Sequence, residues 1–133
     1  MLPTDMWNRD RNCFTARWKI DPAKRERFNE LMSELLVFAK PFYDRGCTFA
    51  FHGWGRDPND RFVVASWDEA VVQELRATSE FQRLNAAMLD CCNGPLVMEQ
   101  FHGLETDRSV FEIYPAGSSA VHLPGKTQEV VFL

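Results

Sequence analysis

The stretch from Arg61 to Glu105 constrains the fold more than any other part of the chain. Residues 61–67 are mostly apolar and β-branched, which predicts a strand. The acidic pair Asp68-Glu69 follows, and such residues suit a helix start because exposed backbone amides and the helix dipole attract negative charge there. A short helix is therefore expected over residues 70–77.

A second helix is predicted directly after the first, capped by Thr78 or Ser79. Its apolar residues fall at helical spacing, at Phe81, Leu84, Met88 and Cys91. Asn93-Gly94-Pro95 is expected to end it, because the first two residues tolerate a left-handed backbone and proline cannot continue a helix. Residues 96–104 should then return to extended structure, so this half reads strand, two helices, strand.

The N-terminal half has the same plan with one longer helix. Residues 12–20 alternate apolar and more polar side chains, which predicts a strand with two unlike faces. Asp21-Pro22 provides an N-cap and a proline suited to the first helical position. The apolar stripe of the following helix consists of Phe28, Leu31, Met32, Leu35 and Phe38. Pro41 is expected to end or kink this helix.

The element order predicts an α+β, ferredoxin-like fold. Residues 47–54 form a predicted second strand, and the turn formers at 56–60 join it as a hairpin to the strand at 61–67. The order is then βαββαβ, which gives an antiparallel sheet covered by helices on one side. The strand at 61–67 is apolar on both sides, so the second sheet face also needs a cover. A homodimer that pairs two sheets face to face is therefore expected.

The core fold is expected to occupy residues 1–105, with residues 1–10 as an N-terminal arm. Residues 106–133 form a C-terminal extension that is predicted to contribute to the dimer interface. Within it, residues 108–114 are expected to form a short fifth strand and residues 118–126 a loop. The apolar end of the chain is either a tail strand or an arm packed onto a partner.

Composition narrows the classes of partner. The chain has 133 residues and a formal net charge of -4, without the positive face that phosphate binding needs, so nucleic acid is not expected. No apolar run approaches the ~20 residues of a membrane span, and no signal-peptide pattern opens the chain, so a cytoplasmic protein is expected. Cys13, Cys47, Cys91 and Cys92 show no CxxC spacing and are expected to be free thiols in or near the core. No metal site is predicted.

Residues 13–105 resemble the antibiotic biosynthesis monooxygenase family of dimeric α+β barrels. The resemblance rests on the element order and on local patterns at Gly46-Cys47, the 56–59 turn, Arg61-Phe62-Val63, Trp67-Asp68-Glu69-Ala70 and Ser79-Glu80-Phe81-Gln82. It implies a cofactor-independent monooxygenase that oxidises a small aromatic substrate, such as an anthrone or quinol, with dioxygen. The alternative is a non-catalytic dimer that binds or senses a small ligand, because fold alone does not determine function.

The resemblance carries over few functional residues. Trp67 matches a tryptophan that lines the active site of polyketide oxygenases in the family. The asparagine four residues before it is Val63 here, and the tyrosine six residues after it is Gln73. An arginine of the last helix has an approximate match at Gln82 or Arg83, which makes Arg83 a candidate substrate contact.

The haem-degrading branch of the family uses a tryptophan and a histidine in its two consecutive helices. The corresponding positions in this chain are Leu75 and Asn85. The haem ligand is therefore missing, and no cofactor is predicted.

Other candidate site residues come from the sequence itself. His52 and His102 lie on two predicted strands, in the repeated tripeptide Phe-His-Gly, and histidine titrates near neutral pH, so each is a candidate base. Arg17 and Trp54 are candidate substrate contacts. The alternatives are an exposed or hydrogen-bonded sheet histidine in each case, a dimer or surface salt bridge for Arg17, and core packing for Trp54 and Trp67. No Ser-His-Asp order or phosphate-binding loop is present, which argues against hydrolase and kinase functions.

Overall fold

The computed structural model describes residues 12–102, 120–123 and 126–132 and confirms the predicted βαββαβ order. The strands and helices are β1 (Asn12–Lys19), the 3₁₀ turn η2 (Pro22–Lys24), α1 (Arg25–Gly46), β2 (Cys47–Trp54), β3 (Asp60–Trp67), α2 (Glu69–Ala77), α3 (Ser79–Leu89), β4 (Leu96–His102), β5 (Ala120–Leu123) and β6 (Lys126–Phe132). No described helix has the length and apolar character needed to cross a bilayer.

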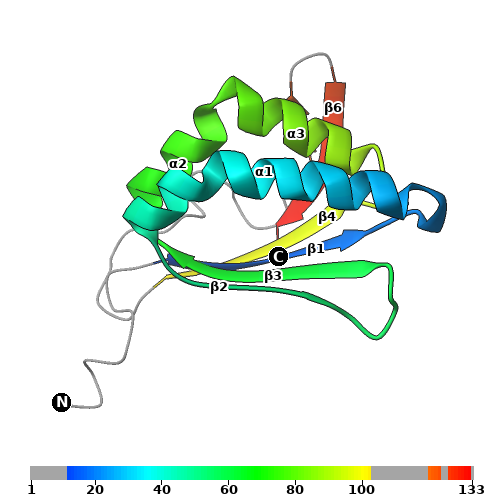
Figure 1. The fold of residues 1–133 in the computed structure, drawn as a ribbon, viewed down its shortest axis with the longest axis horizontal. Helices are drawn as coiled ribbons and strands as arrows, with labels where there is room; N and C mark the ends of the chain where they lie inside the picture. The colour runs from blue at the N-terminus through cyan, green and yellow to red at the C-terminus, as the bar shows by residue number, and fades with distance from the viewer. Residues whose placement is uncertain (1–11, 103–119, 124–125, 133) are drawn as a thin grey trace.

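The sheet has the strand order β2-β3-β1-β4-β6-β5. The first four strands are antiparallel, as predicted, and β6 joins β4 in parallel. Figure 1 shows all three α-helices over one face of these four strands. The fold is thus a two-layer α+β arrangement, with one layer of helices and one layer of sheet.

Local sequence signals explain where most helices begin. The carboxylate of Asp21 accepts a hydrogen bond from the Ala23 amide, and Pro22 opens the 3₁₀ turn that leads into α1. Asp68 caps α2 through the Val71 amide. Thr78, one of the two predicted caps, accepts from the Phe81 amide at the start of α3.

Pro41 does not end α1, so that part of the prediction is wrong. The helix continues through Pro41 to Gly46. Proline removes the hydrogen bond that the carbonyl four residues earlier, on Val37, would accept. Val37 and Pro41 both lie on the exposed side of the helix, where water can satisfy that carbonyl.

The second predicted helix also ends elsewhere than expected. α3 stops at Leu89, and its C-cap is Asp90, so Asn93-Gly94-Pro95 follows the helix at a distance. Residues 91–93 pair with the end of β1 instead: the Asp21 amide donates to the Cys91 carbonyl, and the Asn93 amide donates to the Lys19 carbonyl. This pairing with the sheet competes with another turn of helix.

The C-terminal extension contains more sheet than predicted. Residues 118–126 are not all loop, because β5 occupies Ala120–Leu123 and pairs with β6. β6 in turn pairs with β4, from Leu96 opposite Val130 to Met98 opposite Phe132. Of the two alternatives for the chain end, the structure has a tail strand in the chain's own sheet. The predicted strand at 108–114 lies outside the described residues.

The core lies between the helices and the sheet. Trp18 packs edge-on against Phe28, with ring centroids 5.9 Å apart. The completely or almost completely buried large side chains are Trp67, Phe28, Leu31, Leu84 and Met88. In β1, Ala16 and Trp18 are buried while Arg17 and Lys19 are exposed, as the alternation predicts.

The opposite sheet face carries exposed aromatic residues. Phe49, Phe51 and Phe101 are 54%, 55% and 45% exposed. Phe51 lies opposite Val64, and Phe101 lies opposite Cys13. The neighbours of these two partners, Val63 and Phe14, face the helices, so the phenylalanines point to the other side of the sheet. No described helix covers this face (Figure 1).

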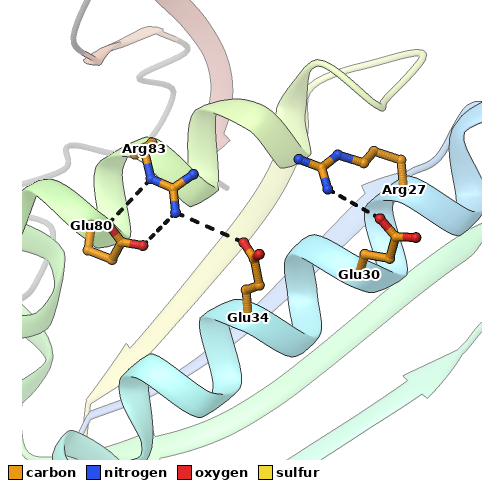
Figure 2. A network of polar contacts seen from close by, with 5 residues as sticks. All are labelled: Arg27, Glu30, Glu34, Glu80 and Arg83. Atoms are coloured by element: carbon orange, nitrogen blue, oxygen red, sulfur yellow. Dashed lines mark hydrogen bonds and ion pairs between the residues drawn. The ribbon is translucent and has the colours of Figure 1, made fainter.

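Ion pairs connect the outer surfaces of α1 and α3. Figure 2 shows Arg83 of α3 reaching Glu80 on its own helix and Glu34 on α1. A second ion pair lies within α1, nearer its N-terminus, where the Arg27 guanidinium is 3.2 Å from the Glu30 carboxylate. All these groups are largely exposed, so water screens them and they hold the helices together only weakly.

Gly46→Ala should destabilise the fold, because Gly46 at the end of α1 packs directly against Val71 of α2. A Cβ at this buried position would lie 2.6 Å from the Val71 Cβ. We expect a loss of about 1–3 kcal/mol in the free energy of unfolding, measured by urea denaturation. Gly94→Ala is the control, because its Cβ would meet only Lys19 Cδ, at 4.0 Å. Equal stability of the two variants would contradict the close contact.

Candidate ligand-binding site

A cavity of about 280 Å³ lies between the helices and the sheet. Its walls come from the four antiparallel strands and all three α-helices, and are mostly apolar. The lining residues are Phe14, Ala16, Trp18, Met32, Leu35, Leu36, Ala39, Tyr43, His52, Val63, Trp67, Val72, Leu75, Arg76, Phe81, Gln82, Asn85, Leu96 and Met98. The volume is near the lower end of the ~300–1,000 Å³ typical of ligand sites, so it suits a small molecule.

The polar residues of the lining include donors and acceptors: Trp18, Trp67 and Arg76 only donate, whereas Tyr43, His52, Gln82 and Asn85 can donate and accept. The indole N–H groups of Trp18 and Trp67 are buried and have no hydrogen-bond acceptor among the described protein groups. A buried donor without an acceptor is costly, and a bound ligand oxygen or an ordered water removes that cost. No aspartate or glutamate is among the described lining residues, whereas Arg76 brings a positive charge.

Tyr43 and His52 form a polar cluster at the cavity wall. The Tyr43 hydroxyl lies 3.5 Å from His52 Nε2, and the Tyr43 ring packs edge-on against Trp67 with centroids 4.6 Å apart. Burial, assisted by the nearby Cys47, raises the pKa of Tyr43 to about 12, so its hydroxyl keeps its proton at neutral pH. Burial and the charge of Arg61 lower the pKa of His52, which favours the neutral imidazole.

Arg61 extends this cluster away from the cavity. Its guanidinium lies 3.3 Å from His52 Nδ1. The Arg61 guanidinium also lies 5.1 Å from the centre of the Trp54 ring, and Arg25 approaches the same ring at 4.2 Å. These cation–π contacts fix the position of Arg61 beside the histidine.

Two of the predicted site residues meet at this cavity. His52 and Trp67 both line it, from β2 and from the end of β3. Trp67 is 2% exposed and borders the cavity. Trp54 is not among the lining residues; it contacts Arg61, which in turn contacts His52.

The other predicted site residues lie apart from the cavity. Arg17 is exposed on the opposite sheet face, where it lies over the Phe62 ring at 5.5 Å. Arg83 is held on the helix surface by Glu80 and Glu34 (Figure 2). The side chain of His102, at the end of β4, lies outside the described residues.

Three residues of the site were missed by the sequence reasoning: Tyr43, Arg61 and Trp18. The two positions matched to haem-binding residues, Leu75 and Asn85, both line the cavity, and neither offers an imidazole. Within residues 12–102 and the described tail strands, no three His, Cys, Asp or Glu side chains gather into a metal site.

No protein-family model and no curated protein sequence matches the chain. Solved structures show which class of fold it has. A protein of Caulobacter crescentus CB15, described provisionally as an antibiotic biosynthesis monooxygenase, superposes with a TM-score of 0.64 at 19% identity, over 75% of this chain and 95% of that one. A conserved protein from Methanosarcina mazei Go1 gives a TM-score of 0.64 at 14% identity, over 72% of this chain and 95% of that one.

A third structure, from Nitrosomonas europaea and also provisionally described as an antibiotic biosynthesis monooxygenase, has a TM-score of 0.61 at 12% identity. It is matched over 71% of this chain and 90% of its own. The resemblance inferred from sequence is therefore confirmed at the level of the fold: the chain has the α+β fold of structures that carry this family's name. At such low identity the likeness says nothing about the reaction.

Proposed function

We propose that the protein is a cofactor-independent monooxygenase of the antibiotic biosynthesis type, acting with dioxygen on a small aromatic substrate of the anthrone or quinol kind. The observation that carries the proposal is the cavity, with apolar walls, two buried indole N–H groups without acceptors and no described carboxylate. These features complement a flat aromatic molecule with an electron-rich oxygen.

The chemistry requires a substrate anion rather than a cofactor. An anthrone or quinol that has lost a proton to solvent is electron-rich enough to reduce dioxygen. The site then needs donors that stabilise the anionic oxygen, and Trp18, Trp67 and Tyr43 are the candidates among the lining residues. The positive charge of Arg76 at the wall favours the anionic form further.

The reaction balances without an external reductant. The substrate anion gives one electron to dioxygen, and the resulting radical pair joins into a peroxide at the ring carbon. Loss of the proton that remains on this carbon breaks the O–O bond and forms the carbonyl. The second oxygen atom leaves as water, so the substrate supplies all four electrons.

The experiment that tests this function is incubation of the purified protein with a panel of anthrones and hydroquinones, with oxygen uptake and ligand binding measured together. Binding with oxygen uptake above the uncatalysed rate is expected. Binding without uptake would support the alternative, a non-catalytic ligand-binding or regulatory dimer on the same fold. Absence of binding would contradict the proposed substrate class.

Trp67→Phe should weaken the binding of a ligand with an acceptor oxygen, because it removes one buried N–H donor and keeps an aromatic wall. We expect a loss of about tenfold in affinity for 9-fluorenone, measured by titration calorimetry. Fluorene, which has the same ring system without the oxygen, is the control ligand and should bind both proteins equally. Equal losses for both ligands would show that Trp67 acts by shape alone.

We further propose that the chain forms a homodimer through the sheet face opposite the helices. Phe49 and Phe51 on β2 and Phe101 on β4 lie on this face, with β3 and β1 between them, and each is about half exposed. Exposed aromatic side chains on a sheet face are a common sign of an interface, and a second copy of the same face would bring the same side chains together by two-fold symmetry. The C-terminal extension, residues 106–133, is proposed to add to this interface.

A further inference from the structure

We propose that Arg61 and His52 are positioning residues that make the Tyr43 hydroxyl a donor toward the cavity, so that the site selects ligands presenting an acceptor oxygen to Tyr43. This inference rests on the proposed function in one respect only: it takes the cavity as the ligand site. The chain of contacts runs from Arg61 to His52 Nδ1 and from His52 Nε2 to the Tyr43 hydroxyl.

Arg61 determines which groups donate and which accept in this series of hydrogen bonds. A guanidinium has only donors and keeps its charge at any physiological pH. The His52 Nδ1 atom, 3.3 Å from it, must therefore act as the acceptor. A neutral imidazole has one donor and one acceptor nitrogen, so the proton of His52 belongs on Nε2.

The tautomer of His52 then determines the orientation of the Tyr43 hydroxyl. With its proton on Nε2, His52 donates to the Tyr43 oxygen over 3.5 Å. The Tyr43 hydrogen cannot also point at His52, and it becomes free for another acceptor. Because Tyr43 lines the cavity, a ligand oxygen there is the natural partner.

Without Arg61 the Tyr43 hydroxyl can reverse its hydrogen-bonding role. The proton of His52 can move to Nδ1, and the Tyr43 hydroxyl then donates to Nε2 and offers only lone pairs to the cavity. Trp54 and Arg25 hold the Arg61 guanidinium in place at the hairpin end of β2 and β3, outside the residues that line the cavity. Arg61 therefore acts through His52 and Tyr43 and need not touch the ligand.

The tautomer can be measured without any ligand. Long-range ¹H–¹⁵N NMR spectra of the full chain at pH 7 should show His52 neutral, with the proton on Nε2. In Arg61→Met, a mixture of tautomers is expected, and the pKa of His52 should rise, because a neighbouring positive charge is gone. Arg61→Lys should keep much of the Nε2–H form, since lysine also donates. A proton on Nδ1 in the wild type would overturn the inference.

The effect on selection is measured with two tricyclic probes of similar shape, 9-fluorenone, which only accepts, and carbazole, which donates through N–H. The wild type should bind fluorenone more tightly, and Arg61→Met should reduce that preference at least fivefold, with partial recovery in Arg61→Lys. Tyr43→Phe should remove the effect of Arg61→Met. An unchanged preference in Arg61→Met overturns the inference while leaving the proposed function intact.

Failure of both probes to bind the wild type would overturn the proposed selection, and it would overturn the ligand site as well if no oxygen uptake is seen. Oxygen uptake with an anthrone, measured on the same preparation, separates a wrong role for Arg61 and His52 from a wrong ligand site. Uptake with no preference between probes rejects only the role of Arg61 and His52, whereas no binding and no uptake rejects the cavity as the functional site.

Discussion

Phe51→Glu should convert the proposed homodimer into monomers at low micromolar concentration. Phe51 is 55% exposed and lies near the middle of β2. It is on the sheet face that the helices do not cover (Figure 1). Two-fold symmetry would bring two unpaired carboxylates into an apolar interface, and burying each costs several kcal/mol. We expect the dimer to weaken at least ~1,000-fold, since every 1.4 kcal/mol is tenfold.

Sedimentation velocity on the intact chain measures this effect. Val37→Glu is the control, because Val37 is 78% exposed on α1, in the layer of helices, and should leave the dimer unchanged. A well-folded wild-type monomer would refute the dimer, and a Phe51→Glu dimer of full strength would refute this interface. A chain truncated after residue 105 tests the extension, and dimerisation as tight as that of the intact chain would refute its role.

Local sequence patterns were enough to predict the fold because its strands and helices are each specified by their own residues. The apolar and polar alternation of residues 12–20, the hairpin turn at 56–60 and the caps at Asp68 and Thr78 all act within a few residues. The wrong predictions concern segments whose structure depends on contacts with residues distant in the sequence. Residues 91–93 leave the helix because the end of β1 offers hydrogen bonds, and β5 exists because β6 lies beside it.

The site could be predicted only in part, for the same reason. His52 and Trp67 were found because a histidine on a strand and a tryptophan at a strand end are visible in the sequence. Tyr43 and Arg61 contact His52 only after α1 has packed on the sheet and β2 has paired with β3. That pairing sets Trp54 opposite Arg61, a register that the hairpin length could have indicated.

Arg17 illustrates a signal that was present but not used. It alternates with Trp18 in β1, and Trp18 is buried toward the helices, so Arg17 had to lie on the other face. The cavity is on the helix side of the sheet. Alternation therefore separates Arg17 from the site without any tertiary information.

Ala39→Phe should abolish ligand binding by filling the cavity. Ala39 is buried in α1 and lines the cavity directly, so a phenyl ring at this position takes up space that a ligand would need. We expect affinity for 9-fluorenone to fall at least ~100-fold, because a ligand could enter only by displacing packed core side chains. Overpacking should lower stability by about 1–3 kcal/mol, a modest cost because the ring enters existing space.

Titration calorimetry and urea denaturation on the same samples separate lost binding from lost folding. Val37→Phe provides the control, since it adds the same ring two residues earlier on the exposed side of α1 and should bind fluorenone normally. Ala39→Leu adds less volume and serves if the phenylalanine variant does not fold. A folded Ala39 variant that binds fluorenone as tightly as the wild type would show that the ligand occupies another site, because no small side-chain movement can restore a filled core cavity.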